Sequence, residues 1–435
     1  MLACARNVQA VQEGRSLSES LAATPAELRA ATQAITFHVM RCAGLAHEIK
    51  QELVARTPPN PWFDALMLVS LALLETAMDA EQEQQAGRTV PREWPVYAVH
   101  TVVDQAVAAA AGQLAMRSYK GLLNATLRRF TRERDAILAQ ARQNPEARWN
   151  HPDWWIRQLR RAYPDTWQAL LEAANQPALM ILRVNRRRAT VVQVLAALEE
   201  AGIEGRAVGA SGIALAASRP VQAIPGFAQG WWSVQDASAQ KAAELLAPAS
   251  GMRVLDACCA PGGKAAHLLE LADIDLTAID SDAARLARVE QNFERLGLDS
   301  GRVVLKAADA SDLDAWWDGR PFDAVLADVP CTASGIVRRH PDIRWLRREG
   351  DIAKTAALQR KIVNALWKTV KPGGRLLYAT CSIFPQEGEQ QALRFLESHA
   401  DAVRLPAPGQ LLPAGSGDHD FPSDGFFYAL FARQA

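Results

Sequence analysis

Two cysteines follow predicted strands, at positions where a side chain can meet a bound ligand. Cys331 closes a DVPC run that begins at Asp328, and Cys381 lies in an ATCS run after another apolar stretch. The carboxyl ends of parallel strands meet at one edge of a sheet, so we expect the two thiols to lie near each other. A thiolate is a nucleophile, and a carboxylate beside it can hydrogen-bond a reacting group. The pattern favours covalent catalysis over the alternative that both cysteines are core thiols.

A glycine-rich turn, DACCAPGGK, runs from Asp256 to Lys264 after a further predicted strand. Its glycines let the backbone approach a ligand closely and present N–H groups at the start of a helix. The spacing matches neither the phosphate-binding loop GxxxxGK[ST] nor the dinucleotide fingerprint GxGxxG. The paired Cys258 and Cys259 are interpreted as packing residues whose backbone contacts the ligand.

Acidic residues end the later strands. Asp280 ends the second strand of this region and suits the two hydroxyls of a ribose, whereas Asp309 is expected to meet an adenine amino group. A single strand-end Asp is often only a helix cap. Three such residues, Asp280, Asp309 and Asp328, lie beside a glycine-rich turn and together indicate a nucleoside ligand. Without the dinucleotide fingerprint, S-adenosylmethionine is favoured over a nicotinamide dinucleotide.

A methyl donor beside two thiols and a carboxylate suits methylation of cytosine at C5. That carbon is a poor nucleophile until a thiolate adds to C6 and makes it enamine-like. Cys381 is the expected nucleophile, and Asp328 is expected to hydrogen-bond N3 as charge develops there. Cys331 is placed to serve the last step, in which the C5 proton is removed and the thiol leaves.

The elements that position these residues lie in the last part of the chain, residues 236–435. Short apolar runs alternate there with helical patterns, which predicts a doubly wound, largely parallel sheet. The loop 406–424 is rich in Gly, Pro and Ser, and a late strand, 425–432, is expected to be antiparallel. The five parallel strands are predicted over Val254–Cys258, Leu276–Asp280, Val303–Ala307, Ala324–Asp328 and Leu376–Thr380.

The rest of the chain is expected to form an all-helical domain over residues 1–148 and a small α/β subdomain over 149–235. Residues 117–134 hold six basic side chains against Glu133 alone, a local net charge of +5. Residues 338–348 hold five arginines against Asp342, a net charge of +4. Both stretches are interpreted as sites of RNA phosphate contact, although a solvated helix face would also explain the first.

The runs DACCAPGGK, LTAID, ADVPCTASG and YATCS together resemble the RNA cytosine-C5 methyltransferase family. The first motif departs from the family's usual DxCAAPGGK at Cys259. The resemblance implies a Rossmann-like domain, with Cys381 as nucleophile and Cys331 as the release cysteine. The residues that it implies in S-adenosylmethionine binding are Cys258, Cys259, Ala260, Pro261, Gly262, Gly263, Lys264, Asp280, Asp309 and Asp328.

The resemblance extends to the N-terminal region, where YKGLLNATLRR resembles the end of a NusB-like RNA-binding domain. The run GIVRRHPDIRW resembles a loop of the branch that methylates cytosine-967 of 16S ribosomal RNA. It implies that ribosomal RNA, free or in an assembling small subunit, is the partner. The expected RNA contacts are Lys120, Arg128, Arg129, Arg338 and Arg339.

The composition of the chain limits the classes of protein to which it can belong. The chain is 49% hydrophobic and 22% charged with a net charge of zero, which is typical of a soluble globular protein. We expect a cytoplasmic monomer with no membrane span, and no metal site because no CxxC pair occurs. A DNA or protein methyltransferase is disfavoured because the fourth strand ends in DVPC. The other rival is an RNA-binding assembly or antitermination factor with an inactive methyltransferase domain.

Overall fold

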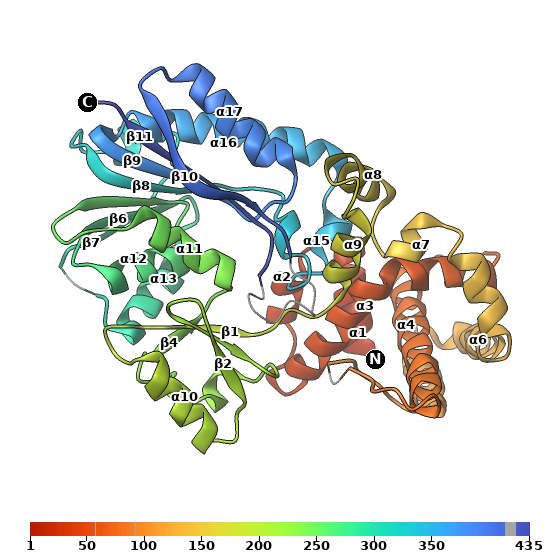
Figure 1. The fold of residues 1–435 in the computed structure, drawn as a ribbon. Helices are drawn as coiled ribbons and strands as arrows, with labels where there is room; N and C mark the ends of the chain where they lie inside the picture. The colour runs from red at the N-terminus through yellow and green to blue at the C-terminus, as the bar shows by residue number, and fades with distance from the viewer. Residues whose placement is uncertain (57, 92, 300, 414–422) are drawn as a thin grey trace. The chain divides into compact units, whose positions relative to one another are not determined.

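The computed structural model describes residues 1–56, 58–91, 93–299, 301–413 and 423–435 (Figure 1). The chain forms two compact units. Unit 1 comprises Met1–Pro177 and Val337–Glu349, and unit 2 comprises Ala178–Ile336 and Gly350–Ala435. The division into three domains with boundaries after residues 148 and 235 stays a prediction.

The described part of unit 1 consists of helices around the apolar helix α4, Pro61–Gln85. Residues on every side of α4 are buried, as expected for a helix with apolar residues all round. Asn60 caps its start by accepting a hydrogen bond from Phe63 N at 3.0 Å, and the proline at the first helical position suits that place. The other helices are α1 (Leu2–Gln12), α2 (Leu17–Ala22), α3 (Ala26–Leu53), α5 (Val99–Ala111), η1 (Arg117–Tyr119), α6 (Lys120–Ala141), α7 (Pro145–Trp149), α8 (Asp153–Ala162), α9 (Trp167–Asn175) and α15 (Ile343–Leu346).

A segment distant in sequence completes unit 1. Residues Val337–Glu349 come between strands of unit 2, yet they pack among the helices of unit 1. Trp345 Nε1 donates to Met40 O at 2.8 Å, and Leu17 N donates to the buried Asp342 at 2.9 Å. The segment is therefore an integral part of the helical unit.

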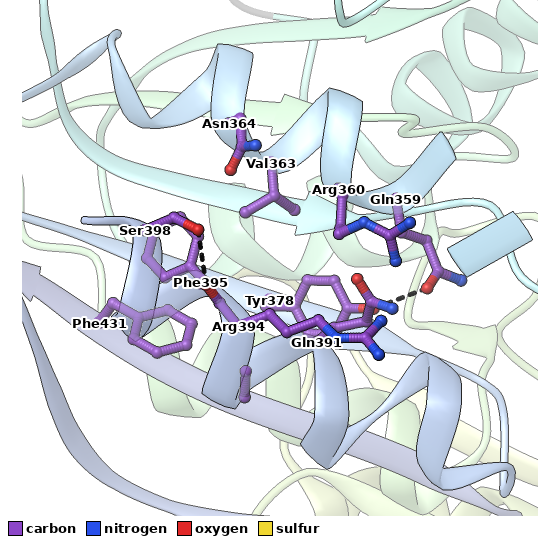
Figure 2. A pocket seen from close by; sticks show the side chains of 11 residues that line it. Gln359, Arg360, Val363, Asn364, Tyr378, Gln391, Arg394, Phe395, Ser398 and Phe431 are labelled. Carbon is purple, nitrogen blue, oxygen red and sulfur yellow. Dashed lines mark hydrogen bonds between the residues drawn. The ribbon is translucent and has the colours of Figure 1, made fainter. Parts of the chain in front are cut away.

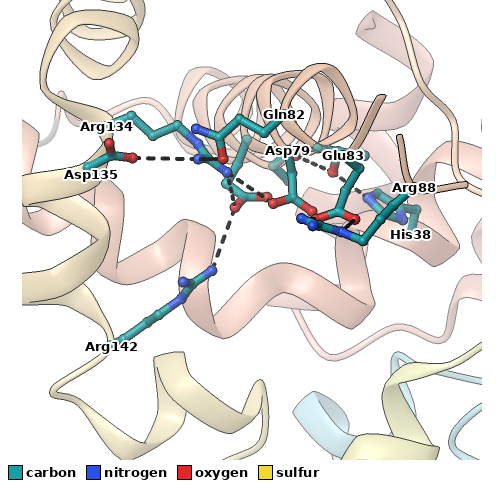
Figure 3. A network of polar contacts seen from close by, with 11 residues as sticks. His38, Asp79, Gln82, Glu83, Arg88, Arg134, Asp135 and Arg142 are labelled. Carbon is teal, nitrogen blue, oxygen red and sulfur yellow. Dashed lines mark hydrogen bonds and ion pairs between the residues drawn. The ribbon is translucent and has the colours of Figure 1, made fainter. Parts of the chain in front are cut away.

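A polar network in unit 1 surrounds Arg134 (Figure 3). The Arg134 guanidinium lies 3.1 Å from Glu75 and 3.3 Å from Asp79, and it donates to Gln82 at 2.8 Å. Its side chain is only 6% exposed. The predicted basic patch over residues 117–134 therefore loses Arg134, whose charge is neutralised inside the unit.

Unit 2 begins with a small antiparallel sheet in the order β2-β3-β1-β4. Its buried Arg183 donates through Nε and Nη2 to both oxygens of Glu270, at 2.9 and 2.6 Å. This fully buried ion pair ties β1 to helix α12 (Gly263–Leu271), which packs on the larger sheet. The elements are β1 (Ile181–Val184), α10 (Val191–Glu200), β2 (Gly205–Val208), β3 (Gly212–Leu215), η2 (Val221–Ala223), β4 (Trp232–Val234) and α11 (Ala237–Leu246).

The larger sheet of unit 2 has seven strands in the order β10-β11-β9-β8-β5-β6-β7. The five strands from β9 to β7 are parallel, whereas β11 and β10 are antiparallel to their neighbours. Chain order reverses between β5 and β8, and ligands of such sheets bind at the carboxyl ends beside that reversal. The strands are β5 (Arg253–Ala257), β6 (Asp275–Asp280), β7 (Val303–Ala307), β8 (Phe322–Asp328), β9 (Val370–Thr380), β10 (Ala402–Leu411) and β11 (Phe426–Arg433).

Helices cover both faces of this sheet, with α16 and α17 on one face and α11, α12 and α13 on the other (Figure 1). Apolar clusters fill the two layers between sheet and helices. The predicted Rossmann-like domain, preceded by an all-α region and a small α/β subdomain, is confirmed. The helices are α12 (Gly263–Leu271), α13 (Ala283–Leu296), α14 (Leu313–Trp316), η3 (Ser334–Ile336), α16 (Glu349–Trp367), η4 (Pro385–Glu387) and α17 (Glu389–Ser398).

One expectation about this sheet was wrong. The stretch predicted as a loop, residues 406–424, contributes its first part to strand β10, which pairs with β11 on the sheet edge. Pro406 is tolerated because an edge strand does not need every backbone N–H. Residues 414–422 lie outside the described residues.

Candidate active site

The glycine-rich turn lies at the carboxyl end of β5. The chain leaves the strand through Cys258 with φ of 61° and enters α12 through Gly262 with φ of 92°. A Cβ at Gly262 would lie 2.9 Å from Val289 Cγ1, so both the backbone angle and the close packing require glycine. The helix that starts here aims its first N–H groups toward the ligand edge of the sheet.

Asp280, at the end of β6, is joined to this turn. Its Oδ2 accepts from Ala260 N at 3.1 Å, and its Oδ1 accepts from Asp282 N at 3.0 Å. The residue is 3% exposed. The carboxylate is thus held rigidly where a ribose is expected, and it also organises the turn.

Asp256 is a buried carboxyl group on β5 without a hydrogen-bond partner at either oxygen among the described residues. Burial raises its pKa well above the usual range, and the nearby Asp328 adds to this. A buried polar group without a partner is costly, so such a group favours the approach of a polar ligand. Together with the glycine turn, this carboxyl group fits a polar cofactor such as S-adenosylmethionine.

The other residues predicted at the cofactor site differ in character. Asp309 is half exposed and accepts from Ser311 N at 2.8 Å and Ser311 Oγ at 2.7 Å, which lowers its pKa. This is local turn capping, and its adenine contact stays a prediction. Burial raises the pKa of Cys258 to about 12 and that of Cys259 even further. Both are therefore protonated thiols, as expected for packing residues.

Lys264 and Asp328 form an ion pair, with Lys264 Nζ 2.6 Å from Asp328 Oδ2. Burial by itself would lower the pKa of Lys264, but the Asp328 carboxylate outweighs it and the pKa is raised. The ammonium therefore keeps its proton beside the carboxyl end of β8. The pair presents an ammonium donor and a carboxylate acceptor side by side.

The two predicted catalytic cysteines meet. Cys331 Sγ lies 3.4 Å from Cys381 Sγ, and both residues are partly buried. The hydrogen bond to Cys381 raises the pKa of Cys331 well above its usual range, and burial adds to this. The contact joins the two thiols, and either sulfur can be its donor.

One residue that the sequence reasoning missed joins the loops of both cysteines. Glu387, in the short helix η4, accepts hydrogen bonds from Thr332 N and Ser382 Oγ, the residues that follow Cys331 and Cys381. Its position six residues after Cys381 was the only signal. In sequence it looks like a solvated loop acid.

The five predicted RNA contacts fall into two groups, all in unit 1. Lys120, Arg128 and Arg129 are exposed on α6. Arg339 is half-buried. Arg338 is only 5% exposed and its carbonyl accepts from Arg41, which corrects the expectation that it presents its charge at the surface.

A small cavity of about 30 Å³ lies between α16 and α17, lined in part by Gln359 and Tyr378 (Figure 2). It has room for water only, and neither cysteine lines it. Among the described residues, no group of His, Cys, Asp and Glu is arranged to hold a metal ion. In the same part of the chain, none of the helices combines the length and apolarity of a membrane span.

Comparison with family models gives two matches. Residues 243–432 match "16S rRNA methyltransferase RsmB/F", and residues 151–222 match the ferredoxin-like domain of RsmF/B-like methyltransferases. The first match covers nearly all of the larger sheet, and the second covers β1, β2 and β3 of the smaller one.

Comparison with individual proteins extends over nearly the whole chain. The "Ribosomal RNA small subunit methyltransferase B" of Klebsiella pneumoniae is 40% identical over 98% of this chain and 96% of its own length. The crystal structure of PH0851 shares the fold with a TM-score of 0.77 at 24% identity, covering 99% of this chain and 98% of that one. A methyltransferase homologue from Pyrococcus horikoshii has a TM-score of 0.56 at 25% identity, over 66% of this chain and 97% of its own.

Proposed function

The chain belongs to the family of 16S rRNA methyltransferases RsmB/F, and from this premise we propose that it methylates C5 of a cytosine in 16S ribosomal RNA. The family resemblance of the GIVRRHPDIRW run points to cytosine-967 as the target. The reaction proceeds through a covalent bond between Cys381 and C6 of the base. The enzyme acts in the cytoplasm, on free RNA or on an assembling small subunit.

S-adenosylmethionine, the cofactor of this family, supplies the methyl group when bound. The turn from Cys258 to Lys264 would hold it, with Asp280 on the ribose and Asp309 near the adenine. The buried carboxyl group of Asp256, which has no hydrogen-bond partner among the described residues, supports this placement.

The first covalent step belongs to Cys381. Its thiolate attacks C6 of the cytosine, and the electron pair of the C5–C6 bond moves toward N3. The Lys264–Asp328 pair, 2.6 Å between its charged atoms, hydrogen-bonds that edge of the base as charge develops. Because the raised pKa of Lys264 keeps the ammonium protonated, a donor is always present. C5 is then nucleophilic enough to take a methyl group.

The last step belongs to Cys331. While Cys381 is a free sulfur, its hydrogen bond and its charge both raise the pKa of Cys331. Once Cys381 is a neutral thioether, both causes disappear and Cys331 ionises more easily. Its thiolate then takes the C5 proton, the C5–H electrons re-form the C5–C6 double bond, and the Cys381 thiolate leaves.

The distance of 3.4 Å between the two sulfur atoms carries this proposal. Bisulfite sequencing of 16S RNA from cells with and without the protein tests it, because 5-methylcytosine resists the deamination that converts cytosine. We expect one cytosine to be protected from deamination in cells with the protein and to lose that protection in cells without it. The protection should return with the wild-type gene but not with Cys381→Ala. An unchanged protection pattern would contradict the activity. An inactive RNA-binding factor would also fail to bind S-adenosylmethionine in calorimetry.

A further inference from the structure

The Glu387 carboxylate is fully buried and saturated with hydrogen bonds. It is 0% exposed. Oε1 accepts from Thr332 N at 2.9 Å, Thr355 Oγ1 at 2.6 Å and Gln359 Nε2 at 3.1 Å. Oε2 accepts from Ser382 Oγ at 2.7 Å and from Thr332 Oγ1. A buried carboxylate needs such a complete set of donors.

The donors come from three separate parts of unit 2. Thr332 follows Cys331 on the loop after β8, Ser382 follows Cys381 on the loop after β9, and Thr355 lies on α16. One carboxylate therefore joins the two cysteine loops to each other and to a covering helix. Networks of this kind fix geometry when every member is satisfied.

We propose that Glu387 is the positioning residue that holds the Cys331 and Cys381 thiols as a pair. The inference rests on the proposed function, because that reaction is what requires two thiols at one place. Its carboxylate bonds Thr332 and Ser382, the residues next to the cysteines, and its charge also raises the pKa of Cys331. Small errors in the placement of reacting groups lower the reaction rate by large factors, so a residue that fixes their placement contributes to the rate.

Other contacts anchor the loops from a different side. Gly335 N donates to Cys381 O at 2.8 Å, and Ser334 Oγ lies 2.9 Å from Ser382 Oγ. These contacts join the β9 loop to residues beyond Thr332. The Glu387 carboxylate bonds the backbone N–H directly after Cys331.

A second layer holds Glu387 itself. The Tyr378 hydroxyl lies 2.7 Å from Glu387 O and 3.0 Å from Gln359 Oε1, either of which can accept its proton, and Gln359 Nε2 donates to Pro330 O at 2.9 Å. Gln359 and Tyr378 form one wall of the cavity drawn in Figure 2. The Glu387 carboxylate and the residues that donate to it are called the clamp. The clamp is thus supported from β9 and α16 and does not depend on η4 alone.

The types of donor allow the charge of Glu387 to be removed while its hydrogen bonds are kept. The two N–H donors face Oε1 and cannot turn into acceptors, whereas both partners of Oε2 are hydroxyl groups that can accept as well as donate. The amide of Glu387→Gln can therefore keep its oxygen toward the N–H groups and its NH₂ toward the hydroxyls. Glu387→Ala cannot satisfy either set.

The test measures the distance between the thiols without RNA. The full-length protein is treated with oxidised glutathione, which Cys381 attacks to give a mixed disulfide and one glutathione thiol. If Cys331 lies near, its thiolate displaces the second glutathione and an internal Cys331–Cys381 disulfide forms. Mass spectrometry of the peptides gives the ratio of internal to mixed disulfide. Cys331→Ala sets the value for the mixed product alone.

We expect the internal disulfide to dominate in the wild type, and the ratio to fall at least tenfold in Glu387→Ala. Glu387→Gln should retain most of the wild-type ratio. The matched control is Glu389→Ala, which removes a neighbouring glutamate that pairs with Arg404 outside the clamp. Thr355→Val removes one donor from α16 and should lower the ratio about threefold, which decides the matter if Glu387→Ala does not fold.

A folded Glu387→Ala protein, or Thr355→Val in its place, with the wild-type ratio would overturn the proposal. A wild type that gives only the mixed disulfide would overturn it as well. Single-turnover methylation should fall in parallel with the ratio while RNA affinity stays unchanged. If the wild type methylates nothing, the proposed function fails, and the disulfide ratio still decides the role of Glu387.

Discussion

Cys331 Sγ and Cys381 Sγ lie 3.4 Å apart at the carboxyl edge of the sheet, on loops that follow the adjacent strands β8 and β9. At this separation a single base can contact both sulfur atoms. The hydrogen bond and burial raise the pKa of Cys331. The division of labour proposed for the two thiols can be measured with variants of each.

Cys381→Ala is expected to abolish both the methylated product and any covalent adduct, because nothing else attacks C6. Cys331→Ala should still form the adduct but slow its release by about 100-fold or more, the usual worth of a general base. The trapped protein–RNA species should survive denaturing electrophoresis, require S-adenosylmethionine, and vanish in the double variant.

Cys42→Ala, in helix α3 of unit 1, is the control and should behave as the wild type. The reverse result, in which Cys381→Ala traps RNA and Cys331→Ala is inert, would exchange the two roles. Full activity of Cys381→Ala would exclude it as the nucleophile.

Asp280→Asn should weaken S-adenosylmethionine binding by about 1.5–3 kcal/mol, the usual worth of hydrogen bonds to a charged group. Asparagine keeps one oxygen for the backbone N–H of Ala260 or Asp282, so the fold is expected to survive. Calorimetry gives the affinity and thermal melting the stability. Asp282→Asn is the control, since Asn caps α13 as well as Asp does. A sharp fall in melting temperature with unchanged affinity would show that Asp280 is purely structural.

Replacing Lys120, Arg128 and Arg129 by Ala should flatten the salt dependence of RNA binding. Each phosphate contact that is lost lowers the log–log slope by about one unit. The three side chains are exposed on α6, whereas Arg134 is occupied by its acidic partners. The control carries three other exposed basic residues, from unit 2, changed to Ala: Lys354, Lys368 and Arg394. Equal slopes for the patch variant and the wild type would remove α6 from the RNA interface.

His38 should make the stability of the protein depend on pH. Burial lowers its pKa from 6.5 to about 4, with Arg41 adding to the shift. Between these two values the unfolded chain binds a proton that the folded protein refuses. Stability from this residue is therefore complete above pH 6.5 and is lost as the pH falls toward 4, by about 1.4 kcal/mol per pH unit.

His38→Gln should remove that part of the slope, because Gln still offers a polar group to Thr76, the partner of His38 at 2.6 Å. Chemical denaturation from pH 7 to pH 5 provides the measurement. The exposed His100, changed to Gln, serves as the control. Parallel pH profiles for His38→Gln and the wild type would contradict the prediction.

Residues that follow strands were predictable from the sequence. Residues whose role depends on contacts between distant parts of the chain were not. The apolar runs located the parallel strands, so Asp280, Asp328 and both cysteines fell at one edge as predicted. Glu387 was missed because its donors lie on three elements that only the fold brings together. Charge density misled at Arg338, since a count of arginines does not reveal whether their segment packs inside a helical unit.

The segment Val337–Glu349 restricts which parts of this protein can be exchanged by recombination. It lies between β8 and α16 in sequence, yet Trp345 and Arg344 donate to the carbonyl groups of Met40 and Ala174 in unit 1. A recombination event that exchanged residues 1–177 for a foreign helical domain would leave both donors without acceptors. A chimera that exchanged the helical part would therefore have to supply equivalent acceptors for this thirteen-residue stretch or exchange the stretch together with the helices.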